Sequence, residues 1–436
     1  MKFKRTLLAA VGAAVLAAPV LVSKAQADQF FPLLVYRTGP YAVGGIPLAN
    51  GFTDYFKLLN ARDGGVNGVK LSYEECETKY NTKIGVECYE KMKNKGEVGP
   101  SLINPYSTGI TYQLIPKAPV DKVPIHSMGY GRTAAGDGRV FPWAFTFPTS
   151  YWSQAAAFIN YVGELEGGMD KLKGKKLVLV YHNSAYGKEP IPTFNLLAKK
   201  YGYEIKMLAV DHPGQEQKAA WLQIRRYRPD YVFLTGWGVM NQVAIKEAAA
   251  INFPMDHFIG NWWSAGETDV RPAGKAAIGY KAATFNQPGA KAGVHADIIK
   301  HVYGGDAAAA KKAQIGEVLY NRGVMNAIYN TESVRTAMGK YGNKAMSGEQ
   351  VRWGMENLDL TQARLNELGV GKFMAPTKVS CADHEGGGKV MFQQWTGTEW
   401  KLISGWIGTM QDVIRPMTEA AAAAYAKENK ITLRSC

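Results

Sequence analysis

Six segments of the sequence combine aromatic residues with hydroxyl residues or glycines, each directly after a short apolar run. They are TGPYAVGG, INPYSTG, HSMGYGRT, HNSAYG, LTGWG and GNWWSAG, and they come from both halves of the chain. If the apolar runs are parallel strands, these segments gather at the carboxyl edge of a sheet, where open α/β proteins bind ligands. Each segment alone is as typical of core packing, but six together predict an aromatic-lined binding cleft.

Motifs that carry catalysis are absent from the sequence. It contains no Gly-x-Ser-x-Gly elbow, phosphate-binding loop, His-Glu-x-x-His pair or dinucleotide-binding glycine pattern. Asp383 begins the segment DHEGGG, whose first three residues could bind a metal, but the glycine run is more typical of a turn. His182, in YHNSAYG, is expected to be a hydrogen-bonding residue of its loop. We therefore expect no enzyme activity, no metal and no cofactor.

The first residues have the three parts of a secretory signal peptide. Basic residues within 1–5 precede an apolar run from Leu7 to Val22, and Ala25-Gln26-Ala27 offers small residues for cleavage. The run is shorter than the roughly 20 residues that a membrane span needs, and no Cys follows it for a lipid anchor. Residues 1–27 are therefore predicted to be removed, leaving an exported, soluble, periplasmic protein.

The size and charge of the remaining chain limit its class. Removal of 27 of the 436 residues leaves 409, too many for one core, so two or more lobes are expected. Four basic residues leave with the peptide, and 47 Lys and Arg remain against 37 Asp and Glu. The basic residues are dispersed, and no basic face has interleaved aromatic residues. We therefore expect no nucleic-acid partner.

All four cysteines, Cys76, Cys88, Cys381 and Cys436, lie in the part predicted to be exported. An even number of cysteines in an oxidising compartment favours disulfides. Pairing Cys76 with Cys88 closes a local loop, and Cys381 with Cys436 would then fix the last residue. The residues alone leave the other two pairings open. A zinc site is not indicated, because no Cys-x-x-Cys or paired-His spacing occurs.

Strand-like and helix-like segments alternate along the first part of the chain. FFPLLVYRTGP predicts a strand and a turn, followed by a helix over about 44–60. VKLSYEEC predicts a second strand and residues 83–93 a second helix, and the short apolar runs PSLINPYST, VPIHSMGY and WAFTFPTS follow. This βαβ succession predicts a parallel sheet covered by helices.

The alternation restarts after Pro148. A helix over about 151–166 precedes KKLVLVYHNSAYG, and helices separate further strands at EIKMLAV, DYVFLTGWG and HFIGNWW. The chain is then expected to be mostly helical over 292–368, to form two short strands around WTGTEW, and to end in an Ala-rich helix over 418–427. Two α/β units without a low-complexity linker predict two lobes joined by several tight crossings.

Several segments resemble the periplasmic substrate-binding proteins of branched-chain amino acid ABC transporters, the leucine-binding type of the type I periplasmic binding protein fold. The resemblance covers most of the mature chain. TGPYAVGG is similar to the family's first loop, and LLNARDGGVNGVKLSYEECETKYNTKIGVE to its succession of helix, Gly-Gly, strand and acidic turn. VYHNSAYGK is similar to the motif in which Tyr-Gly follows a strand, and RRYRPDYVFLTGWG to the Pro-Asp-strand-Gly segment.

The resemblance implies an α/β clamshell of two doubly wound parallel-sheet lobes, joined by three crossings and closing around a ligand. By the family pattern, lobe I consists of residues 28–148 and 286–375. Lobe II consists of residues 149–285 and 376–410. Residues 411–436 form a C-terminal helical tail.

The same resemblance implies how the ligand is held. In amino-acid-binding members, hydroxyls and backbone amides of two lobe I loops bind the ligand carboxylate, and those loops correspond to NPYSTG and SMGYG. Lobe II adds a Tyr from the Tyr-Gly motif and aromatic residues further on, and Tyr41 offers another stacking surface. The expected ligand-binding residues are Tyr41, Tyr106, Ser107, Thr108, Gly129, Tyr130, Tyr186, Trp237 and Trp262.

Two positions depart from the family pattern. Amino-acid-binding members place a Glu after the strand that here ends in FIGNWW, where it holds the ligand's ammonium; the corresponding residue is Trp262 or its neighbour Trp263. Adjacent residues of an extended segment point to opposite sides, so one indole can lie in the core while the other faces the cleft. We favour Trp262 for the cleft, and the alternative is that both rings pack in the core of lobe II. Asn104 stands where a common partner of the first cysteine falls, which supports Cys88 as the partner of Cys76.

Together these features predict a periplasmic solute receptor that delivers a small carboxylate to an ABC permease in the inner membrane. The missing Glu favours an aromatic or otherwise apolar acid over an α-amino acid, although an amino-acid-like ligand stays possible. A sensory ligand-binding protein of the same fold is the alternative. A secreted enzyme is less favoured, because catalytic pairs are missing.

Overall fold

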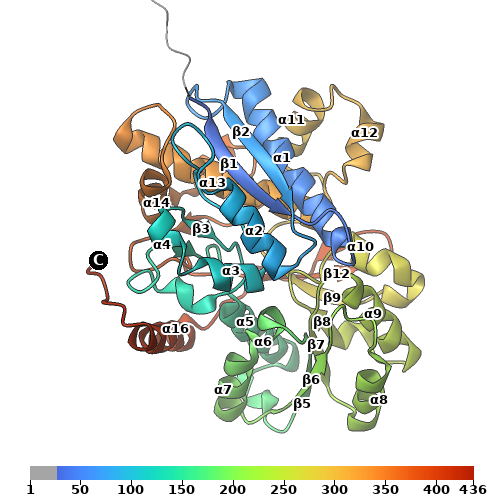
Figure 1. The fold of residues 1–436 in the computed structure, drawn as a ribbon. Helices are drawn as coiled ribbons and strands as arrows, with labels where there is room; N and C mark the ends of the chain where they lie inside the picture. Colours follow the sequence, from blue (N-terminus) through green and yellow to red (C-terminus); the bar gives the residue numbers. More distant parts are fainter. Residues whose placement is uncertain (1–26) are drawn as a thin grey trace, which may run out of the picture.

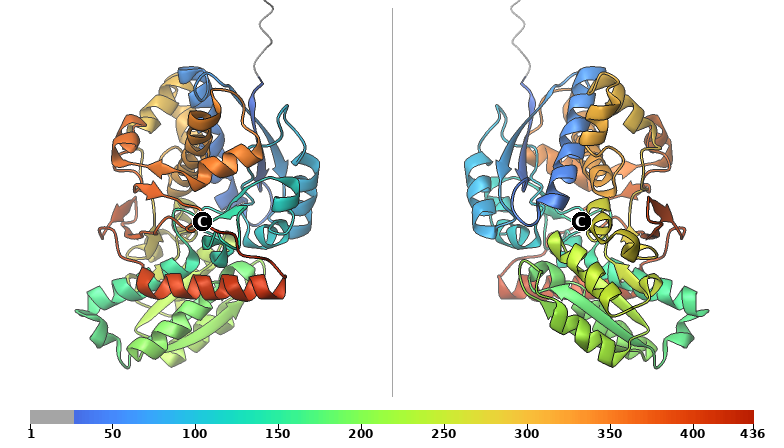
Figure 2. Two further views of the ribbon diagram at one scale, coloured as in Figure 1. Left: turned by 90° about the vertical axis from the view of Figure 1, so that its left-hand side faces the viewer. Right: turned by 90° about the vertical axis from the view of Figure 1, so that its right-hand side faces the viewer.

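The computed structural model describes residues 27–436, so the predicted signal peptide lies outside the described residues except for Ala27. The described chain forms two α/β lobes, the N-terminal one above and the other below in Figure 1, and passes between them three times. Figure 2 shows the same two bodies from both sides. The predicted two-lobe α/β fold is therefore confirmed.

Lobe I is built on a parallel sheet. β1 (Gln29–Val35) pairs in parallel with β2 (Leu71–Glu77). Single bridges through residues 103–104 continue the sheet to the short parallel pair β3 (Ile125–His126) and β4 (Ala144–Phe145). All seven residues of β1 are buried. This burial explains the unbroken apolar run, because helices cover a parallel strand on both faces.

Two long helices far apart in the sequence pack tightly together in lobe I. They are α1 (Ala42–Asp63) and α13 (Val318–Tyr341). A Cβ at Gly51 would lie 2.0 Å from a carbonyl oxygen of α13, and one at Gly323 would lie 2.0 Å from a carbonyl oxygen of α1. Glycine therefore permits this close approach from both sides, and the contact fixes α13 relative to the N-terminal part of the lobe.

Shorter helices and a small ladder complete lobe I. The helices are α2 (Thr82–Met92), α3 (Thr108–Leu114), α4 (Ala118–Asp121), η1 (Thr133–Gly136), α11 (Gly293–His301), α12 (Ala307–Lys312), α14 (Gly348–Glu356) and α15 (Gln362–Glu367). The ladder is the antiparallel pair β10 (Asp359–Leu360) and β11 (Thr377–Lys378). The mostly helical region expected over 292–368 is confirmed.

Lobe II contains one seven-stranded sheet in the order β13-β12-β9-β8-β7-β5-β6. Its strands are β5 (Lys176–His182), β6 (Glu204–Val210), β7 (Tyr231–Thr235), β8 (Phe258–Gly260), β9 (Lys281–Thr284), β12 (Met391–Trp395) and β13 (Trp400–Leu402). β5 to β9 are parallel, whereas β12 and β13 add an antiparallel edge. The late strands thus return to a sheet formed by the middle of the chain.

Helices flank this sheet as the alternating pattern predicts. They are α5 (Tyr151–Glu166), η2 (Met169–Leu172), α6 (Ala185–Lys188), α7 (Ile191–Tyr201), α8 (Lys218–Tyr227), α9 (Val239–Ala250), η3 (Met255–His257), α10 (Glu267–Val270) and η4 (Arg271–Ala277). Ser150 caps α5 by accepting a hydrogen bond from the Ser153 amide. The helix starts and ends at the residues expected from the sequence.

The C-terminal helix is longer than the Ala-rich run alone indicated. α16 spans Gln411–Glu428 and so begins at the first residue of the helical tail expected over 411–436, whereas the Ala-rich run covers only 418–427. Ile414 is fully buried, so packing against the rest of the molecule extends the helix toward its N-terminus. α16 packs against both η1 of lobe I and α5 of lobe II, and Figure 2 shows it lying across the junction.

Both expected disulfides are present. Cys76 in β2 is bonded to Cys88 in α2, and Cys381 is bonded to Cys436, the last residue of the chain. The first bond joins a strand to the helix that covers it, and the second anchors the C-terminal segment. The described residues contain no free cysteine.

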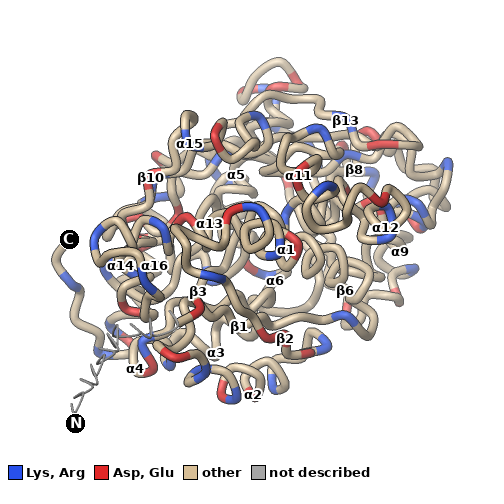
Figure 3. The backbone as a smooth tube through the Cα atoms, turned by 90° about the horizontal axis from the view of Figure 1, so that it is seen from above, with Lys and Arg blue, Asp and Glu red and all other residues tan. Residues whose placement is uncertain are grey.

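Charged residues are dispersed over the surface. In the view from above in Figure 3, Lys and Arg are interspersed with Asp and Glu over the visible part of the chain, as expected from the dispersed basic residues of the sequence. None of the helices within residues 27–436 combines the length and the apolar character that a membrane span requires.

Candidate functional site

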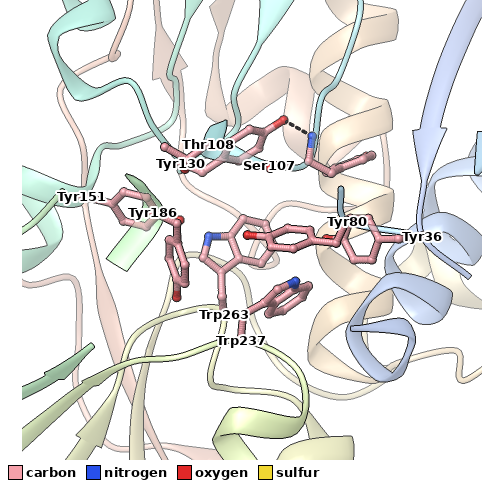
Figure 4. Close-up of a pocket in the computed structure, with 10 residues that line it drawn as sticks. Tyr36, Tyr80, Ser107, Thr108, Tyr130, Tyr151, Tyr186, Trp237 and Trp263 are labelled. Carbon is pink, nitrogen blue, oxygen red and sulfur yellow. Dashed lines mark hydrogen bonds between the residues drawn. The ribbon is translucent and has the colours of Figure 1, made fainter. Parts of the chain in front are cut away.

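A small cavity of about 20 Å³ lies between the two lobes. Six tyrosines, two tryptophans, a serine and a threonine form its walls, and none of these ten residues is Asp, Glu, Lys, Arg or His (Figure 4). Lobe I contributes Tyr36, Tyr80, Tyr106, Ser107, Thr108 and Tyr130; lobe II contributes Tyr151, Tyr186, Trp237 and Trp263. The site therefore offers ring faces and hydroxyl groups but no formal charge.

The lobe I wall is held by hydrogen bonds among its own residues. The backbone amide of Tyr106 donates to Oη of Tyr130 at 2.8 Å, and the Tyr130 hydroxyl donates to the carbonyl of His126 at 3.1 Å. Asn326 of α13 donates to the Tyr106 hydroxyl at 2.8 Å. Oγ1 of Thr108 accepts from the Gly131 amide, which leaves its own proton for another acceptor. Both rings are therefore fixed before any ligand enters.

The lobe II wall is equally constrained. The Tyr186 hydroxyl donates to the carbonyl of Gly236 at 2.8 Å and accepts from the side chain of Asn261 at 2.6 Å. Trp237 meets Trp263 edge to face, with ring centroids 5.5 Å apart. Such aromatic pairs keep their relative orientation at little entropic cost. A preformed wall of this kind favours rigid ligands with ring faces.

Burial keeps the cavity phenols protonated. Desolvation raises the pKa of all six tyrosines above the ordinary value of 10.0, because the phenolate would lose its hydration shell. The tyrosines are consequently neutral donors and acceptors at physiological pH and cannot supply an anion to a positively charged ligand group.

The two adjacent tryptophans have different positions, and the prediction for them is reversed. Trp263 lines the cavity, whereas Trp262 is fully buried behind it, stacked on Tyr151 with centroids 5.6 Å apart. Both indole N–H groups donate to the same acceptor, the carbonyl of Gly129, at 2.8 and 3.3 Å. The chain turns at this loop, so alignment with the family Glu does not identify the side chain that faces the cavity. The pair also joins lobe II to lobe I.

Gly129 lies outside the cavity although it was expected at the site. Its amide donates to the carbonyl of Thr146, and its carbonyl accepts the two indoles, so neither group is left for a ligand. The backbone has φ +68°, and a Cβ would lie 2.8 Å from Phe285. Glycine is therefore required here for the shape of the interlobe contact.

Tyr41 also lies outside the cavity, at another contact between the lobes. Its hydroxyl is 2.9 Å from Nε2 of His182 and 2.8 Å from Nδ1 of His212. His182 also contacts the Ser184 hydroxyl, which confirms its predicted role as a hydrogen-bonding residue. Tyr41 therefore closes the interlobe junction instead of offering a stacking surface.

Six of the expected residues, Tyr106, Ser107, Thr108, Tyr130, Tyr186 and Trp237, do meet at the cavity. Three lining residues were missed, namely Tyr36, Tyr80 and Tyr151, whereas Trp263 was named as the alternative to Trp262. Tyr36 and Tyr80 closely follow β1 and β2, so the rule that ligands gather at strand carboxyl ends contained the signal for both. Tyr151 begins α5 directly after the chain crosses between the lobes, and no local pattern marks it.

The segment DHEGGG forms a turn, as the sequence favoured. Oδ1 of Asp383 accepts from the amides of Glu385 and Gly386, and His384 contacts the carbonyl of Ala144. Within residues 27–436, no group of three or more His, Cys, Asp or Glu side chains could hold a metal ion.

Two α/β lobes that enclose a rigid, uncharged aromatic cavity define a ligand-binding protein of the clamshell type. The sequence profile described as "Periplasmic binding protein" matches residues 29–399. The chain therefore belongs to the periplasmic binding protein family, as the resemblance of its motifs implied. None of the curated proteins matches the chain significantly.

Solved structures agree with this assignment. One described as an ABC transporter permease from the Pseudomonas fluorescens group is 43% identical, with a TM-score of 0.87, and the match covers 94% of this chain and 99% of that one. A branched-chain amino acid ABC transporter protein from Thermus thermophilus with bound valine is 20% identical, with a TM-score of 0.75 over 89% and 99% of the chains. A solute-binding protein from R. palustris in complex with benzoate is 16% identical, with a TM-score of 0.67 over 87% and 98%.

Proposed function

We propose that the protein is the exported solute receptor of an ABC transporter and that its ligand is a small aromatic or otherwise apolar carboxylate. The observation that carries this proposal is the composition of the cavity: eight aromatic side chains and two hydroxyl residues, without an acidic or basic side chain. Rings of the ligand would stack on the walls, and each such pair adds about 0.5–1.5 kcal/mol beyond the burial of area.

The absence of a carboxylate from the walls argues against an α-amino acid. Leaving the ligand's ammonium buried without a counter-ion costs about 2–5 kcal/mol. That cost weakens binding by about tenfold to several thousandfold. The hydroxyls of Ser107 and Thr108 can still donate to a ligand carboxylate, since both face the cavity.

The cavity has a volume of about 20 Å³, far below the usual range for ligand pockets, roughly 300–1,000 Å³. Even a small ligand therefore enters only when the walls move apart. The fold itself accommodates such compounds: the R. palustris relative was solved with benzoate, and the Thermus relative with valine. Ligand binding would favour the closed arrangement of the lobes, and the closed form would be recognised by the permease.

A panel of ligands tests the proposal by thermal unfolding. It contains benzoates, cinnamates, short aliphatic acids and α-amino acids. A ligand at a thousand times its dissociation constant adds about 4 kcal/mol to the free energy of unfolding, which a melting curve resolves. We expect the aromatic acids to give the largest shifts. A strong response to leucine or valine with none to aromatic acids would overturn the proposed ligand class.

Transport is tested separately from binding. Uptake of the best ligand by cells should require both this protein and the membrane permease. Binding without any permease-dependent uptake would favour the sensory alternative.

A further inference from the structure

A fully buried arginine lies directly behind the aromatic wall of the cavity. Arg322 extends from α13 of lobe I and has no exposed surface. Its Nη1 donates to the carbonyl of Trp262, and its Nε and Nη2 lie 3.2 and 3.1 Å from Oδ1 of Asn286. Nη2 also lies 3.4 Å from Oγ1 of Thr284. All of these acceptors are neutral.

Within the described chain, no Asp or Glu is within ion-pairing distance of this guanidinium. Burial lowers the pKa of Arg322 to about 9, so the group stays protonated at neutral pH. Glu267 is the carboxyl whose charge would act on it, but burial raises the pKa of Glu267 to about 8 and keeps that carboxyl mostly protonated. A buried charge without a partner is costly, and proteins normally neutralise it.

The guanidinium contacts the residues that form the cavity wall. Its carbon Cζ lies 5.1 Å from the ring centroid of Trp263 and 4.4 Å from that of Phe285, both within cation–π range. Trp263 lines the cavity. One aromatic ring therefore separates the positive charge from the space that a ligand would occupy.

Another buried carboxylate near the site is already engaged. Glu189 accepts hydrogen bonds from the Tyr112 hydroxyl and from the amide of Thr133, both in lobe I. It forms no ion pair with Arg322. The surroundings of the Arg322 charge are buried, so it acts on the cavity through a medium of low dielectric, where screening by salt is weak.

We propose that Arg322 is a specificity-determining residue: its unpaired guanidinium, acting through Trp263, selects ligands with a negative charge, and the bound ligand is its counter-ion. The inference rests on the proposed ligand-binding function and adds a residue that does not touch the ligand. It also explains how a cavity without charged walls can prefer a carboxylate to a neutral compound of the same shape.

Three planar compounds of nearly equal size test this in the unmodified protein. Benzoate, benzamide and benzamidine carry charges of −1, 0 and +1 on the same ring. Calorimetric titration should give affinities in that order, with about tenfold or more between benzoate and benzamide. Equal affinity for benzoate and benzamide would overturn the inference and leave the binding function standing. No binding of these compounds or of any other panel member would overturn both.

Substitution of the arginine separates charge from structure. Arg322→Gln keeps an N–H donor near the position of Nε, which faces Oδ1 of Asn286, but removes the charge. It should weaken benzoate about tenfold and change benzamide affinity less than twofold. Arg335→Gln is the matched control, because Arg335 lies on the same helix but is partly exposed and paired with Glu332, and it should change neither affinity.

Two results would contradict the role of Arg322. An equal loss for benzoate and benzamide in Arg322→Gln would show that the residue only supports the wall. Retention of the wild-type preference would show that the charge does not act on the ligand, while the proposed function would stand. If the variant does not fold, the order of the affinities of benzoate, benzamide and benzamidine for the unmodified protein decides whether a positive charge acts on the ligand.

Discussion

The two lobes are joined by two regions with different chemistry. Around the cavity, the contacts between the lobes are aromatic edges, such as Tyr130 against Trp263, two indole N–H groups that share the carbonyl of Gly129, and the Arg322 guanidinium on the carbonyl of Trp262. Along α16 and the C-terminal segment, they are ionic and covalent. There Arg415 donates to the carbonyls of Gly136 and Ala382, and the Cys381–Cys436 bond anchors the end of the chain.

The difference matches what each region must do. The indole bonds to the Gly129 carbonyl and the Arg322 bond to the Trp262 carbonyl are all non-covalent, so they can separate when the lobes open and re-form when they close. The C-terminal segment is held by a disulfide and by charge-assisted hydrogen bonds, which are stronger and do not need to break. We infer that the cavity side moves and that the C-terminal side stays fixed.

The largest effects are expected from the tandem tryptophans, and they should differ in kind. Trp262→Ala removes a fully buried ring and should lower the free energy of unfolding by about 3–5 kcal/mol. Trp263→Ala removes a cavity wall and should lower ligand affinity about 100-fold with a smaller loss of stability. Denaturant unfolding and calorimetric titration measure the two quantities. The assignment of the two rings would be wrong if Trp262→Ala weakened binding and left stability unchanged.

Removal of each disulfide tests whether the C-terminal side of the junction contributes to stability without contributing to ligand binding. The Cys381–Cys436 bond spans 55 residues and the Cys76–Cys88 bond spans 12. Chain entropy predicts losses of about 4 and about 3 kcal/mol when each pair is changed to serine. Because neither bond contacts the cavity, ligand affinity at a temperature where the protein is folded should change less than twofold. A marked loss of affinity in Cys381→Ser/Cys436→Ser would show that the C-terminal side takes part in closure.

A pH titration examines the buried carboxyl next to the tandem tryptophans. Burial raises the pKa of Glu267 from 4.5 to about 8 in the folded protein. The contribution of this group to the free energy of unfolding is therefore greatest below pH 4.5 and decreases as the pH rises toward 8. Glu267→Gln cannot ionise and still offers an oxygen to the Val318 amide. The free energy of unfolding of the variant should match that of the wild type near pH 4.5 and exceed it by about 4 kcal/mol at pH 8. A constant difference across this range would mean that Glu267 is not buried in its neutral form.

The smallest effect is expected at Arg415. This side chain is partly exposed. It donates hydrogen bonds to two backbone carbonyls and forms an ion pair with Glu419. Arg415→Gln should lower the free energy of unfolding by about 1 kcal/mol, because solvent replaces much of the lost interaction. Ligand affinity should not change, which a titration with the best panel compound measures. A change in affinity would contradict a fixed C-terminal side.

Much of the cleft was predictable because strands and loops leave local patterns. Tyr106, Ser107, Thr108, Tyr130, Tyr186 and Trp237 follow apolar runs, and the carboxyl ends of parallel strands meet at one edge. Arg322 and Tyr151 left no such pattern. They lie on helices, and their positions depend on how α13 and α5 pack against segments far away in the sequence.

The sequence by itself determined the alternation of strands and helices, the family and the aromatic character of the cleft, because these depend on local periodicity and composition. Only the tertiary structure decided which of Trp262 and Trp263 faces the cavity, why Gly129 is required, and where Arg322 places its charge. The physical reason is that each depends on contacts between lobes: Arg322 and Gly129 belong to lobe I, whereas both tryptophans belong to lobe II. No pattern within one segment can specify such a pairing.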